Sequence, residues 1–453
     1  MTNVPAFNGL GIALRGVQAQ QRGLDVTGHN IANVETEGYS RQEAVLAAAR
    51  PLMLQDGQIQ SGGSAQLGQG VDVQEYRRLR NDFLDLQWRA QQMNSGEADA
   101  QASKLLQIEA ALNDSTESGL GQQLSAFYSA WSALASNPES TAAKTALFAK
   151  AQTLIAGIRS LDQSISDVST TATNERNSLI TSGGPIDLIA REIKTLNDGI
   201  NGAIVRGEQP NDLLDRRDLL LDKLSEYGSV SISVPDGTKP GFLRVTFGGA
   251  ATPLVDNAAV LPATAVTLPT TGTLAASPGG KIEGLQTVIT SAAAYRGMLD
   301  TLASRLVTQV NGQHGSPAFF DGAGTAASTI ALGASLTGPA AILAGSGAAG
   351  DNSIALAIAG QRSSTGTNPT TDWASLVTRV GSDVAEQKAA TLTAQRVLDS
   401  LSAQRASTHG VSLDEEMTNM MRFQRGYQAA ARALTAMDEN LDILINRTGR
   451  VGL

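Results

Sequence analysis

The feature that most constrains this chain is a heptad pattern near its C-terminus. From Leu413 to Ile445, mostly apolar and small side chains recur at alternating spacings of four and three residues. A helix over residues 411–447 would be about 55 Å long at roughly 1.5 Å per residue. Such a helix cannot bury an apolar seam against itself. It therefore requires a partner helix, in this chain or in another.

A similar pattern near the N-terminus supplies a partner within the same chain. The spacing of apolar residues there predicts an amphipathic helix that ends near Asn33. We expect the two helices to pack together, with the first seam facing Tyr427, Leu434 and Leu441. The predicted assembly interface consists of Leu10, Leu14, Val17, Leu24, Ile31, Asn33, Tyr39, Leu413, Met417, Met420, Tyr427, Leu434 and Leu441.

The middle of the chain differs from its ends. Stretches within 229–287 alternate apolar and polar residues, with turn residues at 235–237, and 315–361 is typical of small strands and loops. Aromatic residues make up only 4% of the chain, so its core must be built largely from aliphatic side chains, which suits long helices packed side by side. We therefore predict a mainly α fold with a β-rich insert, in which long coiled-coil-like helices from both termini pack together.

Three domains are expected from this pattern. Residues 1–45 with 410–453 would form a terminal coiled-coil domain. A helical rod domain would comprise 46–228, 288–313 and 366–409, with a pause in its first long helix at 94–96. Residues 229–287 with 314–365 would form an outer insert domain of short strands and loops.

Composition excludes several classes of function. A net charge of −9 argues against a dedicated binder of nucleic acid or of an anionic membrane. Without cysteine and with only three histidines, the chain cannot form disulfides, thiolate metal sites or a histidine-rich metal centre. No apolar run is long enough to span a bilayer, and no cleavable signal peptide is recognisable at the N-terminus. We expect no cofactor, no metal, no nucleic-acid partner and no membrane partner.

Two patterns could suggest an enzyme. Residues 345–350 match G-x-G-x-x-G, but no parallel strand is predicted to follow, and chance matches are expected in a chain with 46 glycines. Asp25 and His29 stand four residues apart, near Ser40, but a catalytic triad also needs an oxyanion site. We expect His29 simply to end the helix. A nucleotide-binding enzyme remains a less favoured alternative, which the lack of a parallel sheet would exclude.

Two charged runs have simple structural interpretations. Arg77, Arg78 and Arg80 are surrounded by acidic residues, which predicts a solvated face and not a phosphate-binding track. The acidic residues at 414–416 stand at a helix start, where they complement the helix dipole. Neither run indicates catalysis.

Several motifs resemble those of bacterial flagellar axial proteins. The N-terminal signature ends in Gly38-Tyr39-Ser40-Arg41-Gln42, which is similar to the hook-associated protein 1 family within that group. The segments that carry the resemblance are 29–34, 38–42, 211–218, 350–358, 410–416 and 423–432. The region 229–345 matches nothing specifically.

The resemblance implies a structural, non-enzymatic component of the bacterial flagellum. Such a protein would form the hook–filament junction, would be required for filament assembly and motility, and would be extracellular after type III export without a cleaved signal peptide. Its implied partners are a ring of about eleven copies of itself, the hook protein, the second hook–filament junction protein and a cytoplasmic export chaperone on the C-terminal helix. The alternative is another axial protein, either the second junction protein or the hook protein, although Ser40-Arg41-Gln42 argues against the hook protein.

Overall fold

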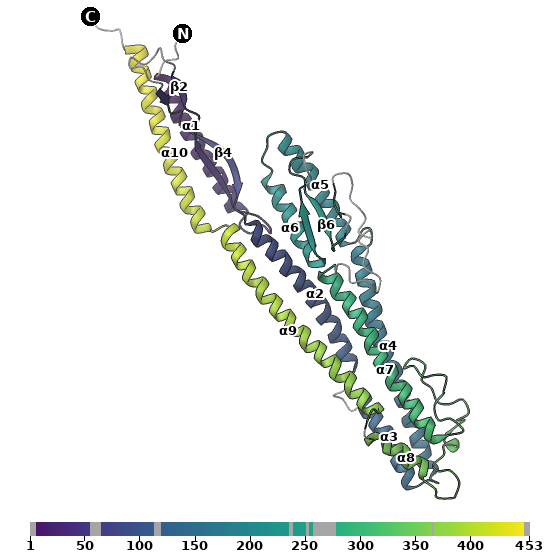
Figure 1. Cartoon of the computed structure of the whole chain (residues 1–453). Coiled ribbons are helices and arrows are strands. Elements are labelled where there is room, and N and C mark those ends of the chain that lie inside the picture. Colours follow the sequence, from purple (N-terminus) through teal and green to yellow (C-terminus); the bar gives the residue numbers. More distant parts are fainter. Residues whose placement is uncertain are drawn as a thin grey trace, which may run out of the picture.

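The computed structural model describes residues 6–54, 65–112, 119–234, 239–250, 253–256, 278–364 and 366–447. This part of the chain is elongated and mainly helical, and both termini lie at the same end (Figure 1). The helices are α1 Ala6–Ala32, α2 Asp82–Leu112, α3 Leu120–Ser136, α4 Thr141–Ile180, α5 Pro185–Val205, α6 Asn211–Tyr227, α7 Gly280–His314, α8 Ser353–Gly360, α9 Pro369–His409 and α10 Leu413–Asp442.

The strands are short and pair only with an antiparallel neighbour in the described residues. They form three two-stranded sheets: β1 Gln42–Ala48 with β4 Val71–Arg78, β2 Leu52–Leu54 with β3 Ala65–Leu67, and β5 Val230–Ser233 with β6 Arg244–Phe247. The predicted fold class is therefore confirmed as mainly α with small β elements. The turn predicted at 235–237 lies outside the described residues, as do 257–277 and 448–453.

Two antiparallel helix pairs form the long axis of the molecule. The α1–α10 pair stands at the end with the termini, and α2 and α9 continue from it into the rod (Figure 1). The start of α9 is fixed by its sequence, because the Asn368 side chain accepts hydrogen bonds from the backbone amides of Thr370 and Thr371. Thr371 Oγ1 accepts the Asn368 amide in return, which completes a capping box.

Three predicted boundaries differ from the structure. The predicted pause at 94–96 is absent, and α2 continues through these residues. Gly96 instead marks a close approach to α6, since a Cβ there would lie 2.3 Å from the Glu226 carbonyl oxygen. Helix α7 begins at Gly280 and not at 288. Within 315–361, where strands and loops were predicted, α8 forms an additional helix at Ser353–Gly360.

The described hydrophobic core has two parts. One lies at the end far from the termini and joins α3, α4, α7 and α8 around Trp131, Phe127 and Phe319. The other joins α5 and α6 to the β5–β6 hairpin through Val245 and Phe247. The two stretches assigned to one outer insert, 229–287 and 314–365, thus pack at two different places along the rod. The three-domain division stays a prediction.

A buried arginine attaches the β5–β6 hairpin to α5 and α6. Arg217 Nη1 donates to Asn197 Oδ1 (2.9 Å) and to the Gly241 carbonyl (2.6 Å). The Asn197 side chain also bonds both the N–H and the C=O of Leu243. Burial lowers the pKa of Arg217 to about 10, so the side chain remains charged at neutral pH. The hairpin is therefore held by hydrogen bonds as well as by apolar packing.

His314 is buried in the first core in its neutral form. Its Nδ1–H donates to the Pro317 carbonyl (2.7 Å), and its Nε2 accepts the Leu343 amide (3.0 Å). Protonation of Nε2 would break the second bond and place a charge beside Trp131 and Phe319. Burial accordingly lowers the pKa of His314, although the hydrogen bond to Pro317 opposes this shift.

We expect stability to fall between pH 7.5 and pH 5.5. A histidine whose folded pKa lies below its unfolded value of about 6.5 stabilises the fold fully above that value and progressively less below it. A His314→Gln variant should therefore show a smaller decrease in Tm across this interval than the unmodified chain, by calorimetry. The remainder should be reduced by His409→Gln, because burial also lowers the pKa of His409. An undiminished pH dependence in His314→Gln would contradict this assignment.

Candidate functional site

Helices α1 and α10 pack in a single antiparallel register. Hydrogen bonding joins Asn30 to Glu416, and close approaches pair Gly23 with Phe423, Gly16 with Ala430 and Gly9 with Met437. In each pair the two residue numbers add to 446, which is what one uninterrupted antiparallel register requires. The pairing of the two terminal helices, expected from the heptads, is therefore present within one chain.

The seam of α1 that faces α10 lies one residue before the predicted seam and consists mainly of small residues. A Cβ on Gly23 would lie 2.6 Å from the Phe423 ring, and one on Gly16 would lie 3.5 Å from the Ala430 Cβ. The same heptad frame contains Ala13 and Thr27, which are both buried. The absence of large side chains lets the backbones approach closely. The seam facing α10 consists of Gly9, Ala13, Gly16, Gln20, Gly23, Thr27 and Asn30.

The stripe of α1 that lies opposite the β1–β4 sheet, together with a stripe of α10, forms what we call the open face. Asn8, Ile12 and Arg15 contact the β1–β4 side, through Gly68, Gly70 and Asp72 respectively. At about 100° per residue, the predicted leucine seam lies on the side of α1 away from these contacts. At the same 100° per residue, Leu413 and Met417 of the antiparallel α10 project to that side. The open face consists of Leu10, Leu14, Val17, Leu24, Ile31, Leu413 and Met417.

The predicted interface residues divide between the open face and the seam. Leu14, Leu413 and Met417 are 48%, 49% and 55% exposed, and the other predicted residues of α1 are partly buried. On α10, Met420, Leu434 and Leu441 are partly buried, and Tyr427 is 39% exposed. Asn33 closes the end of α1 by donating to the His29 carbonyl (3.0 Å).

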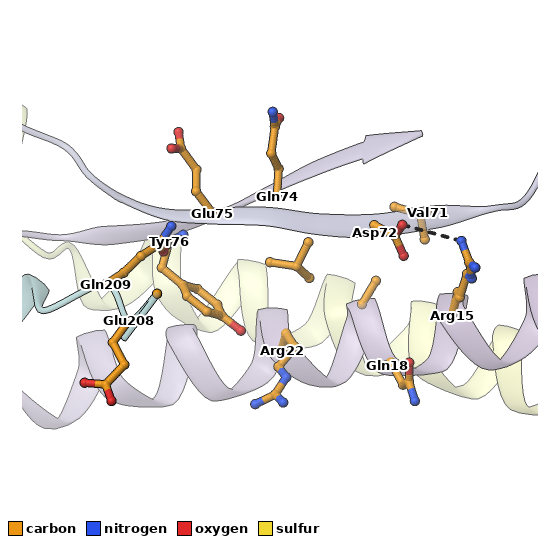
Figure 2. Close-up of a pocket in the computed structure, with 13 residues that line it drawn as sticks. Arg15, Gln18, Arg22, Val71, Asp72, Gln74, Glu75, Tyr76, Glu208 and Gln209 are labelled. Carbon is orange, nitrogen blue, oxygen red and sulfur yellow. Dashed lines mark hydrogen bonds and ion pairs between the residues drawn. The ribbon is translucent and has the colours of Figure 1, made fainter. Parts of the chain in front are cut away.

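On the other side of α1, a groove of about 610 Å³ runs between this helix and β4 (Figure 2). Arg15 and Arg22 line it from α1, Asp72 of β4 pairs with Arg15, and Glu75 and Glu208 are also among its lining residues. Because side chains of both charges line the groove, it favours neither an anion nor a cation. The α5–α6 loop closes one end, where Gln209 Oε1 accepts the Tyr76 amide (2.6 Å).

A polar joint connects the terminal helix pair to the rod. The joint has at its centre four arginines and four aspartates: Arg78, Arg80, Arg89, Arg405, Asp85, Asp215, Asp218 and Asp222. Asp222 accepts from Arg89 (2.6 Å) and Arg405 (2.7 Å), and Asp85 from Arg80 (2.8 Å) and Arg405 (2.9 Å). These contacts tie the start of α2 and the C-terminal half of α6 to the end of α9.

The prediction of a solvated basic face is wrong for two of its three arginines. The Arg78 and Arg80 side chains are 18% and 8% exposed and pair with aspartates of α6 and α2. Only Arg77 is solvated, beside Glu43. Of the neighbouring acidic residues only Asp85 is a partner, to Arg80, and the other partner carboxylates, at 215 and 218, are distant in the chain.

Charge pairing outweighs burial within the joint. Burial alone would raise the pKa of Asp218, but Arg80, Arg78 and Arg89 more than compensate and hold it below its usual range. Likewise, burial would lower the pKa of Arg80, yet Asp218 and Asp85 raise it. Four positive and four negative groups balance one another, so the joint can remain ionised although little water reaches it.

The patterns that might indicate an enzyme have structural roles. The loop at 345–350 folds around Asp351, whose carboxylate accepts the amides of Ser346 (2.7 Å) and Ser353 (2.9 Å). The hydrogen bonds from Ser353 and Ser346 lower the pKa of Asp351 to about 2. These amides are occupied by the chain's own carboxylate, and the described sheets contain no parallel strands that a dinucleotide site would need.

The possible triad and a metal site are likewise not formed. His29 Nε2 lies 3.3 Å from Asp212, and the Ser40 amide donates to Asp215, so neither residue is arranged around the other. Among the described residues, no group of three or more His, Asp or Glu side chains could hold a metal ion. Nor is any helix among them long and apolar enough to cross a bilayer.

The joint was missed by the sequence analysis, although its parts were quoted there. The segments 29–34, 38–42, 211–218 and 410–416 all contribute to it. A usable signal existed in α6, where acidic residues recur at 212, 215, 218 and 222 and so form one stripe on the helix. The sequence did not indicate which arginines pair with this acidic stripe.

Known protein families match the two terminal helices and a large central part of the chain. The family described as "Flagellar hook-associated protein FlgK helical domain" matches residues 105–326. "Flagella basal body rod protein" matches 10–39, and "Flagellar basal body rod FlgEFG protein C-terminal" matches 403–447. The matches thus cover most of both terminal helices and the helices α3 to α7.

Individual relatives agree with these family matches. The chain is 29% identical to flagellar hook-associated protein 1 of Bacillus subtilis, over 98% of each chain. It is 31% identical to the protein of the same name in Escherichia coli over 50% of this chain and 39% of that one. The solved structure of the flagellar hook junction protein FlgK from Burkholderia pseudomallei is 21% identical, covers 51% of this chain and 43% of that one, and has a TM-score of 0.43.

Proposed function

We propose that the chain, which is similar to flagellar hook-associated protein 1, is a structural component of the junction between the hook and the filament of the bacterial flagellum. The observation that carries this proposal is the match to the Bacillus subtilis protein over 98% of both chains. The match to the helical domain at 105–326 favours this family over the hook protein, since the terminal matches are to rod-protein families. The named relatives are structural proteins, which suggests that the chain is not an enzyme.

The proposed assembly is a ring of about eleven copies. The hook protein would lie below the ring and the second junction protein above it. The open face supports a contact between copies, because Leu14, Leu413 and Met417 on it would otherwise remain about half exposed to water. We propose that the predicted interface residues act there, with Leu14, Leu413 and Met417 in the contact.

Export and location complete the proposal. The chain would leave the cell through the flagellar type III apparatus without a cleaved signal peptide and remain extracellular. A cytoplasmic chaperone would cover the C-terminal helix beforehand, and the exposed Met417 and Met421 suit an adaptable contact of that kind. The terminal coiled coil, the rod and the outer insert would be its three domains.

Gold-labelled antibody against this chain tests the location on isolated flagella. Label should collect in one band between hook and filament, and a deletion strain should make hooks without filaments. Label along the whole hook, or only beyond the junction, would instead indicate the hook protein or the second junction protein. Filaments in the deletion strain would remove the requirement for assembly.

We expect the α1–α10 pairing to persist within each copy after assembly. The chain has no cysteine, and a Cβ on Gly16 lies 3.5 Å from the Ala430 Cβ, within the range for a disulfide. A Gly16→Cys, Ala430→Cys variant should form an intrachain disulfide in oxidised flagella, seen as a shifted monomer on a non-reducing gel. Leu14→Cys with Ala430→Cys is the matched control and should remain reduced. A disulfide-linked dimer would show that the helices pair between copies.

A further inference from the structure

We propose that Asn30 is a positioning residue that selects a carboxylate at 416 in the first turn of α10, and so fixes the terminal helix pair against the rod. The contact joins residues 386 positions apart. The inference deepens the proposed function, because it states what the C-terminal segment must carry for the two ends of the chain to join. The contacts that support the inference are those of Asn30, Tyr39, Gln42 and Glu416, next to the joint.

The Asn30 side chain uses all of its hydrogen-bonding capacity. Its Oδ1 accepts the Tyr39 hydroxyl (2.7 Å) and the Gln42 amide (3.0 Å). Its Nδ2 donates to the Gln42 carbonyl (2.9 Å) and to Glu416 Oε2 (3.2 Å). A carboxamide offers two donors and an oxygen with two lone pairs, and each is matched here by a group of the opposite kind. An aspartate in this place would offer no donor.

Three of the four groups that bond Asn30 have a fixed role as donor or acceptor. Burial, and then the carboxylates of Asp212, Asp215 and Glu416, raise the pKa of Tyr39, so its hydroxyl remains a donor. The Gln42 groups belong to the backbone and cannot be exchanged. Glu416 is therefore the only one of the four partners whose polarity a point substitution can invert.

Glu416 needs the hydrogen bond from Asn30 because it is 1% exposed, and water cannot solvate its carboxylate. Its Oε1 lies 2.8 Å from Arg41 Nε, while Arg41 Nη1 donates to Glu415 (2.6 Å). The Arg41 amide donates to the His409 carbonyl at the end of α9 (2.9 Å). Arg41 therefore bridges the break between α9 and α10, and a carboxylate at 416 without Asn30 and Arg41 would be a buried charge lacking partners.

The same contacts close the β1–β4 hairpin at the joint. Asn30 occupies both backbone groups of Gln42 on one edge, and on the other edge Gln209 and Asn211 occupy the N–H and C=O of Tyr76. Carboxamide side chains thus take the place of neighbouring strands on both edges. Asn30 lies where α1, β1 and α10 meet, so loss of its contacts should loosen all three together.

A double-mutant cycle tests the pair. Asn30→Asp keeps the size of the side chain, but it removes both donors and faces Glu416 with a second negative charge. Glu416→Gln removes that charge and supplies an amide donor to the carboxylate introduced at position 30. Each variant and the double variant are made in the Gly16→Cys, Ala430→Cys chain, and the intrachain disulfide yield is measured on purified protein and on flagella. Asn8→Asp, at the exposed start of α1, is the matched control.

Asn30→Asp should lower the disulfide yield and the number of filaments per cell by about tenfold or more, whereas Glu416→Gln alone should have a smaller effect. The double variant should recover a substantial part of both losses. Additive losses without recovery, or equal yields in all four chains, would overturn the proposal. The yield on purified protein does not depend on where the chain acts, so a failure of the proposed function would appear only in the labelling of flagella.

Discussion

A Gly23→Leu variant is expected to be secreted in normal amounts but not to enter the hook–filament junction. A side chain at this position meets the Phe423 ring, since a Cβ would already lie 2.6 Å from it. Overpacking a close contact typically costs about 1–3 kcal/mol, and separating the helices here would also disrupt the approaches at Gly16 and Gly9. An apolar substitution in an apolar seam should thus be as harmful as a polar one.

Gly11→Leu is the matched control, because a Cβ at Gly11 meets nothing within 4 Å. Replacing an exposed helical glycine should even stabilise α1 by up to about 1 kcal/mol. The measurement is the amount of each variant in purified hook–filament junctions, relative to the amount secreted. Normal incorporation of Gly23→Leu would show that the glycine seam does not face α10 in the assembled state.

The largest loss of stability is expected from Asp222→Ala. Its carboxylate bridges Arg89 (2.6 Å) and Arg405 (2.7 Å), and removing it leaves two buried guanidinium groups short of a partner. Breaking a buried ion pair by deleting one member typically costs about 3–5 kcal/mol. We expect this loss in the free energy of unfolding of the part that contains the joint, with a lower Tm for that transition in calorimetry.

Asp198→Ala provides the comparison, since Asp198 makes only an exposed pair with Lys194 (2.7 Å), worth at most about 1 kcal/mol. Asp222→Asn keeps the shape and removes the charge, so it serves if the alanine variant does not fold. Equal effects of the substitutions at 198 and 222 would contradict the assignment of the joint as a buried, interdependent network.

The terminal helices could be predicted because their signals are local. Alternating spacings of three and four residues, and the polar residues and glycine gathered at 33–38, act within a few turns of the chain. The heptads also implied that each helix needed a partner, and each terminal helix was the evident candidate for the other.

The face of α1 that meets α10 could not be predicted from hydrophobicity. The leucine stripe and the glycine stripe are both regular heptads, displaced by one residue, and a pattern search favours the more apolar of the two. Close backbone approach is a property of the pair of helices. It favours small residues in this seam, most strictly at Gly23, where a Cβ would lie 2.6 Å from the Phe423 ring, and it leaves the leucines for another contact.

The Arg–Asp joint shows the same division. The sequence by itself determined which charges exist, their spacing along α6 and the helices that carry them. Only the tertiary structure decided that Arg78 and Arg80 are buried, that Asn30 meets Glu416 and that the separate family motifs converge at one place. The physical reason is that helix periodicity arises from bonds between residues a few positions apart. Most of the burial and charge pairing at the joint depends instead on contacts between residues more than a hundred positions apart, which a local pattern does not encode.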